Sequence, residues 1–137
     1  MISAFAIIAA MLTSALLFGG MMLYSFGFAA FVFSALPPET ARSTIRSAFP
    51  HFYLFVIGTA ALAAALTWSH DTVSATALGA IALTAVPARQ ILMPAINRAT
   101  DTGAKPRFKW LHGLSVVITL IHIGIAAWVL SRFIGPV

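Results

Sequence analysis

Apolar residues fall into four long runs separated by short polar stretches. The first run has no charged side chain before residue 39, and the other three cover residues 52–69, 72 to about 93, and 110–133. A helix needs about 20 apolar residues to cross a hydrocarbon core of about 30 Å. We therefore predict an all-α, integral membrane four-helix bundle in a single transmembrane domain over residues 1–137. Its helices are expected at about 3–36, 50–69, 72–95 and 107–133.

Polar residues and prolines punctuate these runs. Pro37 and Pro38 are expected to end the first helix, because proline cannot continue the backbone hydrogen-bond ladder. Residues 39–48 and 97–109 are expected to be polar connections, and His70-Asp71 a tight turn. The first run has no basic segment before it and exceeds the apolar stretch of about 7–15 residues found in signal peptides, so we expect an uncleaved helix.

Composition agrees with a membrane protein. Hydrophobic residues make up 61% of the chain and charged residues 8%, against about 45–50% and about 25% in soluble domains. This excludes a free-standing soluble enzyme, and the absence of cysteine excludes disulfides and thiolate ligands. The three acidic residues, Glu39, Asp71 and Asp101, all lie outside the apolar runs. Since enzymes need positioned acids, bases or metals, we expect a protein that is not an enzyme.

The basic residues predict an orientation. Seven of the eight Lys and Arg residues lie in or beside the first and third connections, and only Arg132 lies near the other end. The positive-inside rule then places these connections in the cytoplasm and both termini on the outer side. We expect the basic loops to lie against anionic lipid headgroups, where each Lys or Arg contributes about 1 kcal/mol. No nucleic acid is expected as a partner, because the basic segments have no interleaved aromatic side chains beyond Phe108 and Trp110.

The tryptophans support the same orientation. Trp110 lies at the predicted inner boundary of the membrane, and Trp68 and Trp128 lie at the outer one. Trp110 and Trp128 are separated by about 27 Å at about 1.5 Å per helical residue. This distance is close to the thickness of the hydrocarbon core, as expected for side chains that favour both interfaces.

A polar stripe on the last helix is the candidate site. It comprises His112, Ser115, Thr119 and His122, which follow one another at steps of three, four and three. At 100° per residue they cover an arc of about 80°, so we expect both histidines to face the bundle interior. An ionisable residue at the depth of His122 is a functional-site hypothesis by default.

Three roles stay open for this stripe. A neutral histidine can form a hydrogen bond between helices, worth about 0.6 kcal/mol, or it can ligate haem, or it can relay protons. The two histidines lie about 15 Å apart along the helix, so each would need a haem-ligating partner from another helix. His51 and Arg89 are the expected contacts at the cytoplasmic end. No cofactor is predicted, with haem as the alternative.

Methionines on the first helix raise the question of a metal. Thioethers bind soft metals, and this helix contains Met11, Met21 and Met22. Without cysteine nearby, we interpret them as flexible apolar filling, and the sequence assigns no metal ligand. Small residues at four-residue spacing, Ala61 with Ala65 and Ala75 with Gly79, are expected to form packing seams between helices.

Four short segments of the chain form a recognisable series. In chain order they are Phe33-Ser34-Ala35-Leu36-Pro37, Phe49-Pro50-His51-Phe52-Tyr53, Ala88-Arg89 followed by Pro94, and His112-Gly113-Leu114-Ser115. Together they resemble the transmembrane protein 205-like family, an uncharacterised bacterial membrane domain. The resemblance extends over nearly the whole chain. It implies a four-helix protein of a bacterial inner membrane without established biochemistry or catalytic residues. The chain differs from the family pattern at Thr119, where asparagine is common, and in lacking an acidic residue before Pro94.

Three classes of function follow. The sequence favours a non-enzymatic multi-pass protein, either an accessory subunit or a component that handles a solute or a metal. The first alternative is a haem-binding or redox protein that uses a buried histidine of the last helix. The second is an oligomeric transporter, although spans without acidic residues leave little to couple ions. We expect a homo-oligomer or a membrane-protein partner in either of the non-redox cases.

Overall fold

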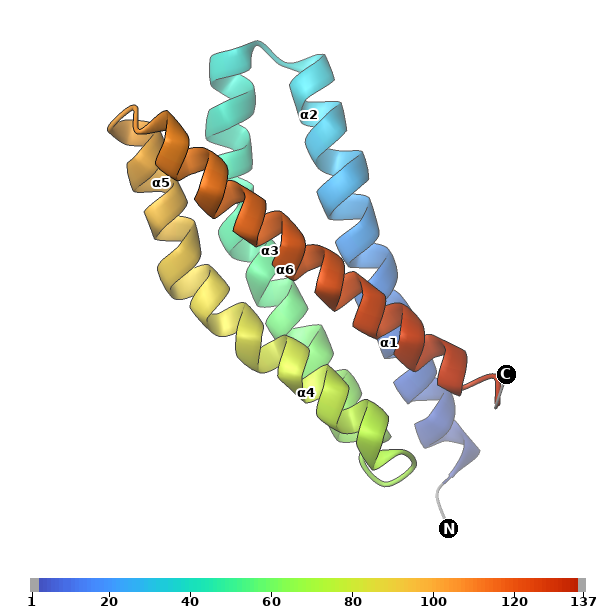
Figure 1. The fold of residues 1–137 in the computed structure, drawn as a ribbon. Helices are drawn as coiled ribbons and strands as arrows, with labels where there is room; N and C mark the ends of the chain where they lie inside the picture. Colours follow the sequence, from blue (N-terminus) through green and yellow to red (C-terminus); the bar gives the residue numbers. More distant parts are fainter. Residues whose placement is uncertain (1–2, 136–137) are drawn as a thin grey trace.

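The computed structural model describes residues 3–135, which form an antiparallel bundle of four long helices (Figure 1). Each helix is 28–32 residues long and is long and apolar enough to cross a membrane. Two of the helices contain a π-helical turn, labelled η. In chain order the four helices are α1 (Ala4–Met22) with η1 (Leu23–Phe28) and α2 (Ala29–Ala35); α3 (Pro38–Thr67); α4 (Thr72–Pro87) with η2 (Ala88–Leu92) and α5 (Met93–Asp101); and α6 (Lys105–Arg132).

The helices form a ring in which each one packs on two neighbours. Both α1 and α4 pack against α3 and against α6, and α5 continues along α6. The described ends of the chain and the turn at 68–71 lie at one end of the bundle, and the short connections at 36–37 and 102–104 lie at the other (Figure 1). The predicted up-and-down arrangement of four helices is confirmed.

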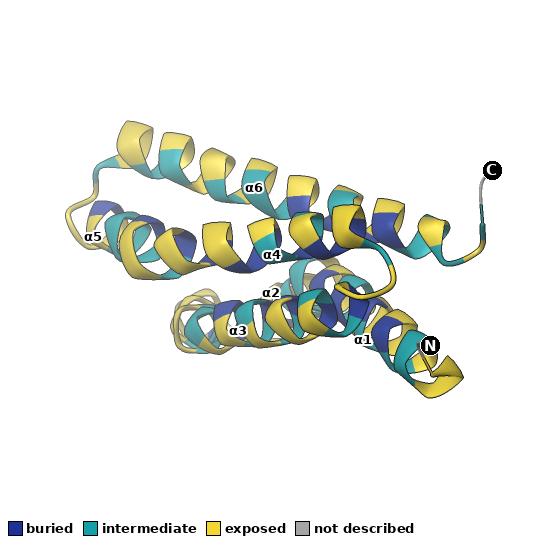
Figure 2. Ribbon diagram, turned by 90° about the horizontal axis from the view of Figure 1, so that it is seen from below, coloured by how far each residue is buried: buried dark blue, intermediate teal, exposed yellow. Residues whose placement is uncertain are grey.

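Burial divides the bundle into two halves (Figure 2). We call residues 3–21, 52–86 and 122–135 the terminal half, and residues 22–51 and 87–121 the basic half. The basic half contains only five fully buried residues: Val32, Ala41, Ala88, Leu92 and Ala99. All other buried residues described, including every buried residue of α6, belong to the terminal half. Tight packing of all four helices is therefore a property of the terminal half.

Small residues allow the helices of the terminal half to approach closely. A Cβ atom at Gly20 would overlap the ring of Phe55, so this ring lies directly on the backbone of the first helix. In the terminal half of α3, the buried alanines are Ala60 and Ala63, whereas Ala61 and Ala65 of the predicted seam are exposed. The buried alanines thus precede the predicted pair by one and two positions and are spaced by three residues instead of four. An apolar groove of about 440 Å³ remains on the outer surface between α3 and α4.

The second helix begins twelve residues earlier than predicted, at Pro38 instead of residue 50. The polar segment 39–48 is helical and not a loop. Pro38 suits the first helical position, where its missing N–H costs nothing, and Glu39 lies in the first turn, where a negative charge is stabilised. The hydroxyls of Thr44 and Ser47 donate to backbone carbonyls of their own helix. Pro50 is accommodated inside the helix with the loss of one backbone hydrogen bond.

The third helix also passes its predicted end. It continues through Pro87 and Pro94 to Asp101, with the π-helical turn η2 between the two prolines. A π-helical turn changes the pattern of backbone hydrogen bonds, and here it lies beside positions where proline has already removed a donor. The fourth helix begins at Lys105, so the predicted polar connection at 97–109 is reduced to residues 102–104. The chain reverses there through Gly103, whose φ of 67° favours glycine.

Candidate functional site

The polar stripe of α6 divides between the two halves of the bundle. His122 is buried, Ser115 and Thr119 are half-buried, and His112 is exposed. The prediction that both histidines face the interior is therefore right for His122 and wrong for His112. All buried residues of α6 lie from His122 onward, where α6 packs among its neighbours. Farther toward Lys105 the stripe is only partly covered, and the exposed His112 stacks on Phe108 of its own helix with ring centres 5.5 Å apart.

Ser115 and Thr119 satisfy their hydroxyls within α6. The Ser115 hydroxyl donates to the carbonyl of His112 at 2.7 Å, and the Thr119 hydroxyl donates to the carbonyl of Ser115 at 2.9 Å. Such bonds to the preceding turn are common for serine and threonine in helices. Neither residue connects α6 to another helix.

His122 makes the one contact of the stripe that joins two helices. Its Nε2 lies 2.8 Å from Oγ1 of Thr84 on α4. The same Thr84 hydroxyl lies 2.7 Å from the carbonyl of Ala80. A hydroxyl has a single proton, so when Thr84 donates to Ala80, His122 must donate from Nε2 to the Thr84 oxygen. The pair is thus complete with a neutral histidine protonated on Nε2.

The sequence-based prediction of the site does not include Thr84, although the sequence around this residue is suggestive. It is the only polar residue between Thr76 and Pro87. An isolated threonine in an apolar span is a hydrogen-bonding candidate for a polar group on a neighbouring helix. Locating it opposite His122 required the relative heights of α4 and α6, which the sequence does not supply.

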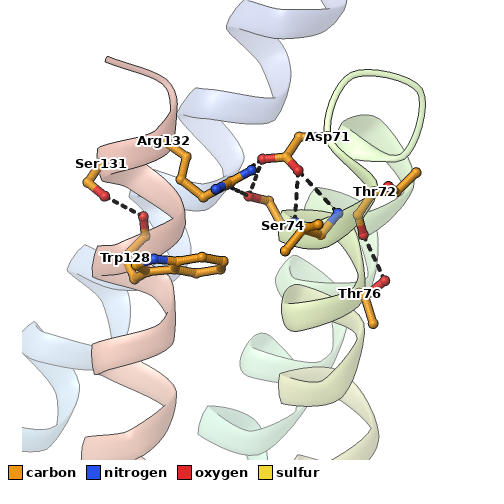
Figure 3. Close-up of polar contacts among 8 residues, drawn as sticks. Asp71, Thr72, Ser74, Thr76, Trp128, Ser131 and Arg132 are labelled. Carbon is orange, nitrogen blue, oxygen red and sulfur yellow. Dashed lines mark hydrogen bonds and ion pairs between the residues drawn. The ribbon is translucent and has the colours of Figure 1, made fainter. Parts of the chain in front are cut away.

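A second polar cluster joins α4 to α6 at the end of the bundle nearest the chain termini (Figure 3). Asp71 is the N-cap of α4 and accepts from the backbone N–H groups of Val73 and Ser74 at 3.1 and 3.2 Å. Its other carboxylate oxygen accepts from the Ser74 hydroxyl and from Nε of Arg132, each at 2.6 Å. The turn predicted at His70-Asp71 therefore also anchors the last helix.

The environment of Asp71 keeps its carboxylate charged. The Arg132 guanidinium, together with the hydrogen bonds from Ser74, holds the pKa of Asp71 well below its usual range, against the opposing effect of partial burial. The guanidinium carbon of Arg132 also lies 5.1 Å from the ring centre of Trp128 (Figure 3), a distance typical of a cation–π contact. The sequence does not predict this ion pair directly. A signal is present, however, because Asp71 and Arg132 are the only acidic and the only basic residue described at this end of the bundle.

The opposite end is rich in unpaired cations. Arg46 of α3 forms a bidentate pair with Asp101 of α5 at 2.6 and 2.9 Å. Arg89, one of the two residues expected as contacts at the cytoplasmic end, donates from Nε to the carbonyl of Pro50 at 3.3 Å, whereas the other, His51, is exposed. Arg89 has no carboxylate partner among the described residues. The same is true of five other cations at this end: Arg42, Arg98, Lys105, Arg107 and Lys109.

Within residues 3–135, no group of three or more His, Cys, Asp or Glu side chains is arranged to hold a metal ion. The methionines of the first helix differ in burial. Met21 is fully buried in the core, whereas Met11 and Met22 are each 38% exposed.

These features define a class of protein: an all-helical chain with four helices long and apolar enough to span a membrane, and with few polar contacts between them. Residues 12–105 match a family model described as "Domain of unknown function (DUF4149)". The match covers more than half of the chain, so the chain belongs to this uncharacterised family. No curated protein and no solved structure matches the chain.

Proposed function

We propose that the chain is a non-enzymatic, multi-pass protein of a bacterial inner membrane, seated with its basic half toward the cytoplasm and both termini on the outer side. Its role would be that of an accessory subunit, or of a component that handles a solute or a metal, within a homo-oligomer or beside another membrane protein. The transmembrane protein 205-like relationship suggested by the four sequence segments is part of this proposal.

The difference in charge between the two ends is the observation that carries the proposal. In the terminal half, the only Asp, Glu, Lys or Arg residues described are Asp71 and Arg132, and they neutralise each other. The other seven Lys and Arg residues lie in the basic half with only two acidic residues. Positive charge of this kind is retained on the cytoplasmic side and is attracted to anionic lipid headgroups.

The arrangement of the acidic residues supports a role other than catalysis. Asp71 and Asp101 are each held by an arginine, and Glu39 lies in the first turn of α3. His122 is bonded to a threonine hydroxyl and not to a carboxylate. An acid–base pair, the usual minimum for proton transfer in an active site, is therefore not formed by the described groups around His122.

Reporter fusions test the orientation. Alkaline phosphatase, which is active only outside the cytoplasm, is fused after Val137, and a fluorescent protein that matures in the cytoplasm is fused at the same position in a second, parallel fusion. We expect an active phosphatase and a dark fluorescent protein. The same two reporters inserted at Gly103 are expected to give the opposite result. A bright fluorescent protein after Val137 would overturn the proposal.

A further inference from the structure

The guanidinium of Arg89 is oriented by the protein but only partly used by it. Arg89 lies on η2 and is half-buried, and its Nε donates to the backbone carbonyl of Pro50 on α3. In the part of the chain that the structure describes, neither Nη1 nor Nη2 has a hydrogen-bond partner or a carboxylate within 4.0 Å. The two outer nitrogens, which match the geometry of a carboxylate or phosphate, are therefore available.

No acidic residue of the chain can serve as the counterion of Arg89. Asp71 is bound to Arg132 in the other half, and Asp101 is bound to Arg46. Glu39 precedes Pro50 by eleven residues on the same helix, a separation of about 16 Å at about 1.5 Å per residue. This is farther than an arginine side chain anchored at Pro50 reaches. The charge of Arg89 must be balanced by something other than this chain's carboxylates.

With the proposed seating of the basic half, Arg89 is expected near the lipid headgroups. Pro50 and Trp68 are separated by 18 positions on α3, or about 27 Å. Trp110 and Trp128 have the same separation on α6. Tryptophan favours the two membrane interfaces, and these lie about 30 Å apart across the hydrocarbon core. The contact between Arg89 and Pro50 is therefore at the interface of the basic half, where a long cationic side chain extends toward the headgroups.

The backbone around Arg89 is irregular in three helices at once. Pro50 interrupts the hydrogen bonds of α3, and η2 interrupts those of the third helix. Tyr24 of η1 stacks on Phe52 of α3 with ring centres 4.8 Å apart, so the other π-helical turn lies beside the same segment. π-helical turns are frequent at functional sites. Arg89 on η2 and its acceptor at Pro50 thus both lie where the regular helical hydrogen bonding is interrupted.

We propose that Arg89 binds the phosphate group of one anionic phospholipid, with Nη1 and Nη2 donating to two phosphate oxygens while Nε remains on the Pro50 carbonyl. This inference rests on the proposed seating of the basic half on anionic headgroups. It deepens that proposal, because it replaces a diffuse attraction by a single saturable site. Arginine suits such a site better than lysine, because its planar fork serves both acceptors at once.

Lipid titration of the full-length, detergent-purified chain tests the site, with bound lipids counted by native mass spectrometry. The probes are phosphatidylglycerol, phosphatidylcholine and inorganic phosphate. We expect the wild type to bind one phosphatidylglycerol more tightly than phosphatidylcholine, and inorganic phosphate at equal concentration not to displace it. Arg89→Gln should weaken this binding about tenfold or more, as loss of charge-assisted hydrogen bonds does. Arg107→Gln, which removes an exposed cation of the same half, should weaken it by less than about threefold.

Arg89→Lys keeps the charge and carries the test if Arg89→Gln does not fold. The single ammonium nitrogen of lysine lacks the planar fork that binds two phosphate oxygens side by side while Nε stays on the Pro50 carbonyl, so the affinity of this variant should also fall by about tenfold. Wild-type affinity in either Arg89 variant would overturn the site, as would displacement by inorganic phosphate. An equal loss in Arg107→Gln would overturn the single site but leave the proposed seating on anionic lipid intact. Equal binding of phosphatidylglycerol and phosphatidylcholine by the wild type would contradict both the single site and the proposed seating on anionic lipid.

Discussion

The two halves of the bundle have the same helices but opposite character. In the terminal half, four regular helices are packed together, and the only acid and base described there neutralise each other. The basic half contains every described proline and both π-helical turns, its part of α6 has no buried residue, and unpaired cations accumulate there. Stability is therefore expected to depend on the terminal half, and interactions with other molecules on the basic half.

Four predictions test this comparison, and the largest effect is expected at Gly20. In Gly20→Ala the new methyl group would overlap the Phe55 ring, and overpacking of this kind destabilises by about 1–3 kcal/mol. Gly19→Ala is the matched control, because its Cβ would meet nothing within 4 Å. Gly113→Ala in the basic half should be equally harmless for the same reason. Equilibrium unfolding of the solubilised protein measures the stability of all three variants. An equal loss of unfolding free energy in the three would contradict the division into halves.

The second prediction concerns Asp71. Asp71→Ala removes the N-cap of α4, which is worth about 1 kcal/mol, and also the partner of Arg132. Asp71→Asn keeps a capping acceptor but loses the charge, so it should destabilise less than Asp71→Ala. The difference between the two variants in equilibrium unfolding separates the cap from the ion pair. Equal stability of Asp71→Ala and the wild type would show that this end does not hold α6 in place.

Asp71 also predicts a dependence on pH. The folded-state pKa of Asp71 is lowered by Arg132 and Ser74, so the carboxylate stabilises the fold above the pKa of an unfolded aspartate, about 3.9. This contribution is expected to be lost as the pH falls below that value toward the lower pKa of the folded state. Asp71→Asn should lack this part of the acid destabilisation. Identical acid unfolding of the two proteins would contradict the assignment.

The sequence predicts the structure of the terminal half better than that of the basic half. The four spans, the tight turn at residues 68–71 and the burial of His122 follow from hydrophobic runs and helical periodicity, and all are present in the structure. The errors in the helix boundaries lie in the basic half, where polar and proline-rich segments expected to be loops continue as helix. Proline at the first turn of a helix or beside a π-helical turn is tolerated, and a local rule does not reveal this.

The candidate site shows the same limit. The helical wheel places His112 and His122 on one face, but it does not show how far the neighbouring helices cover that face. Only the packing of α6 on α1 and α4 reveals that the cover begins at His122. Similarly, the contacts of Thr84 and Arg132 depend on the alignment of two distant helices, and no local pattern encodes that alignment.

The third prediction distinguishes a structural His122 from a functional one. In His122→Leu the Thr84 hydroxyl can still donate to Ala80, so the loss should be only about 0.6 kcal/mol. In Thr84→Val the buried N–H of His122 loses its acceptor, and the cost should be about 1 kcal/mol or more. Thr119→Val, whose hydroxyl bonds only its own helix in the basic half, should change the free energy of unfolding least. Equilibrium unfolding of the three solubilised variants measures these differences.

His122→Gln completes this test, because glutamine retains hydrogen-bonding groups but neither ligates iron as imidazole does nor titrates near neutrality. A structural His122 predicts near wild-type stability for this variant. A Soret band in the visible spectrum of the purified wild type, lost in both His122→Gln and His122→Leu, would instead support the haem alternative. These outcomes cannot be mistaken for each other, since one is a change in unfolding and the other a change in absorption.

The smallest effect is expected at Ser14, the one flaw in the otherwise well-satisfied terminal half. Its side chain is fully buried on α1, and its hydroxyl is the only buried side-chain polar atom of the described residues without a hydrogen-bond partner. An unsatisfied buried donor costs free energy, so Ser14→Ala should leave stability unchanged or raise it by up to about 1 kcal/mol. Ser74→Ala in the same half should lower stability, because that hydroxyl donates to Asp71. Destabilisation of Ser14→Ala by more than about 1 kcal/mol would contradict this assignment, because it would show that the buried hydroxyl does form a stabilising hydrogen bond.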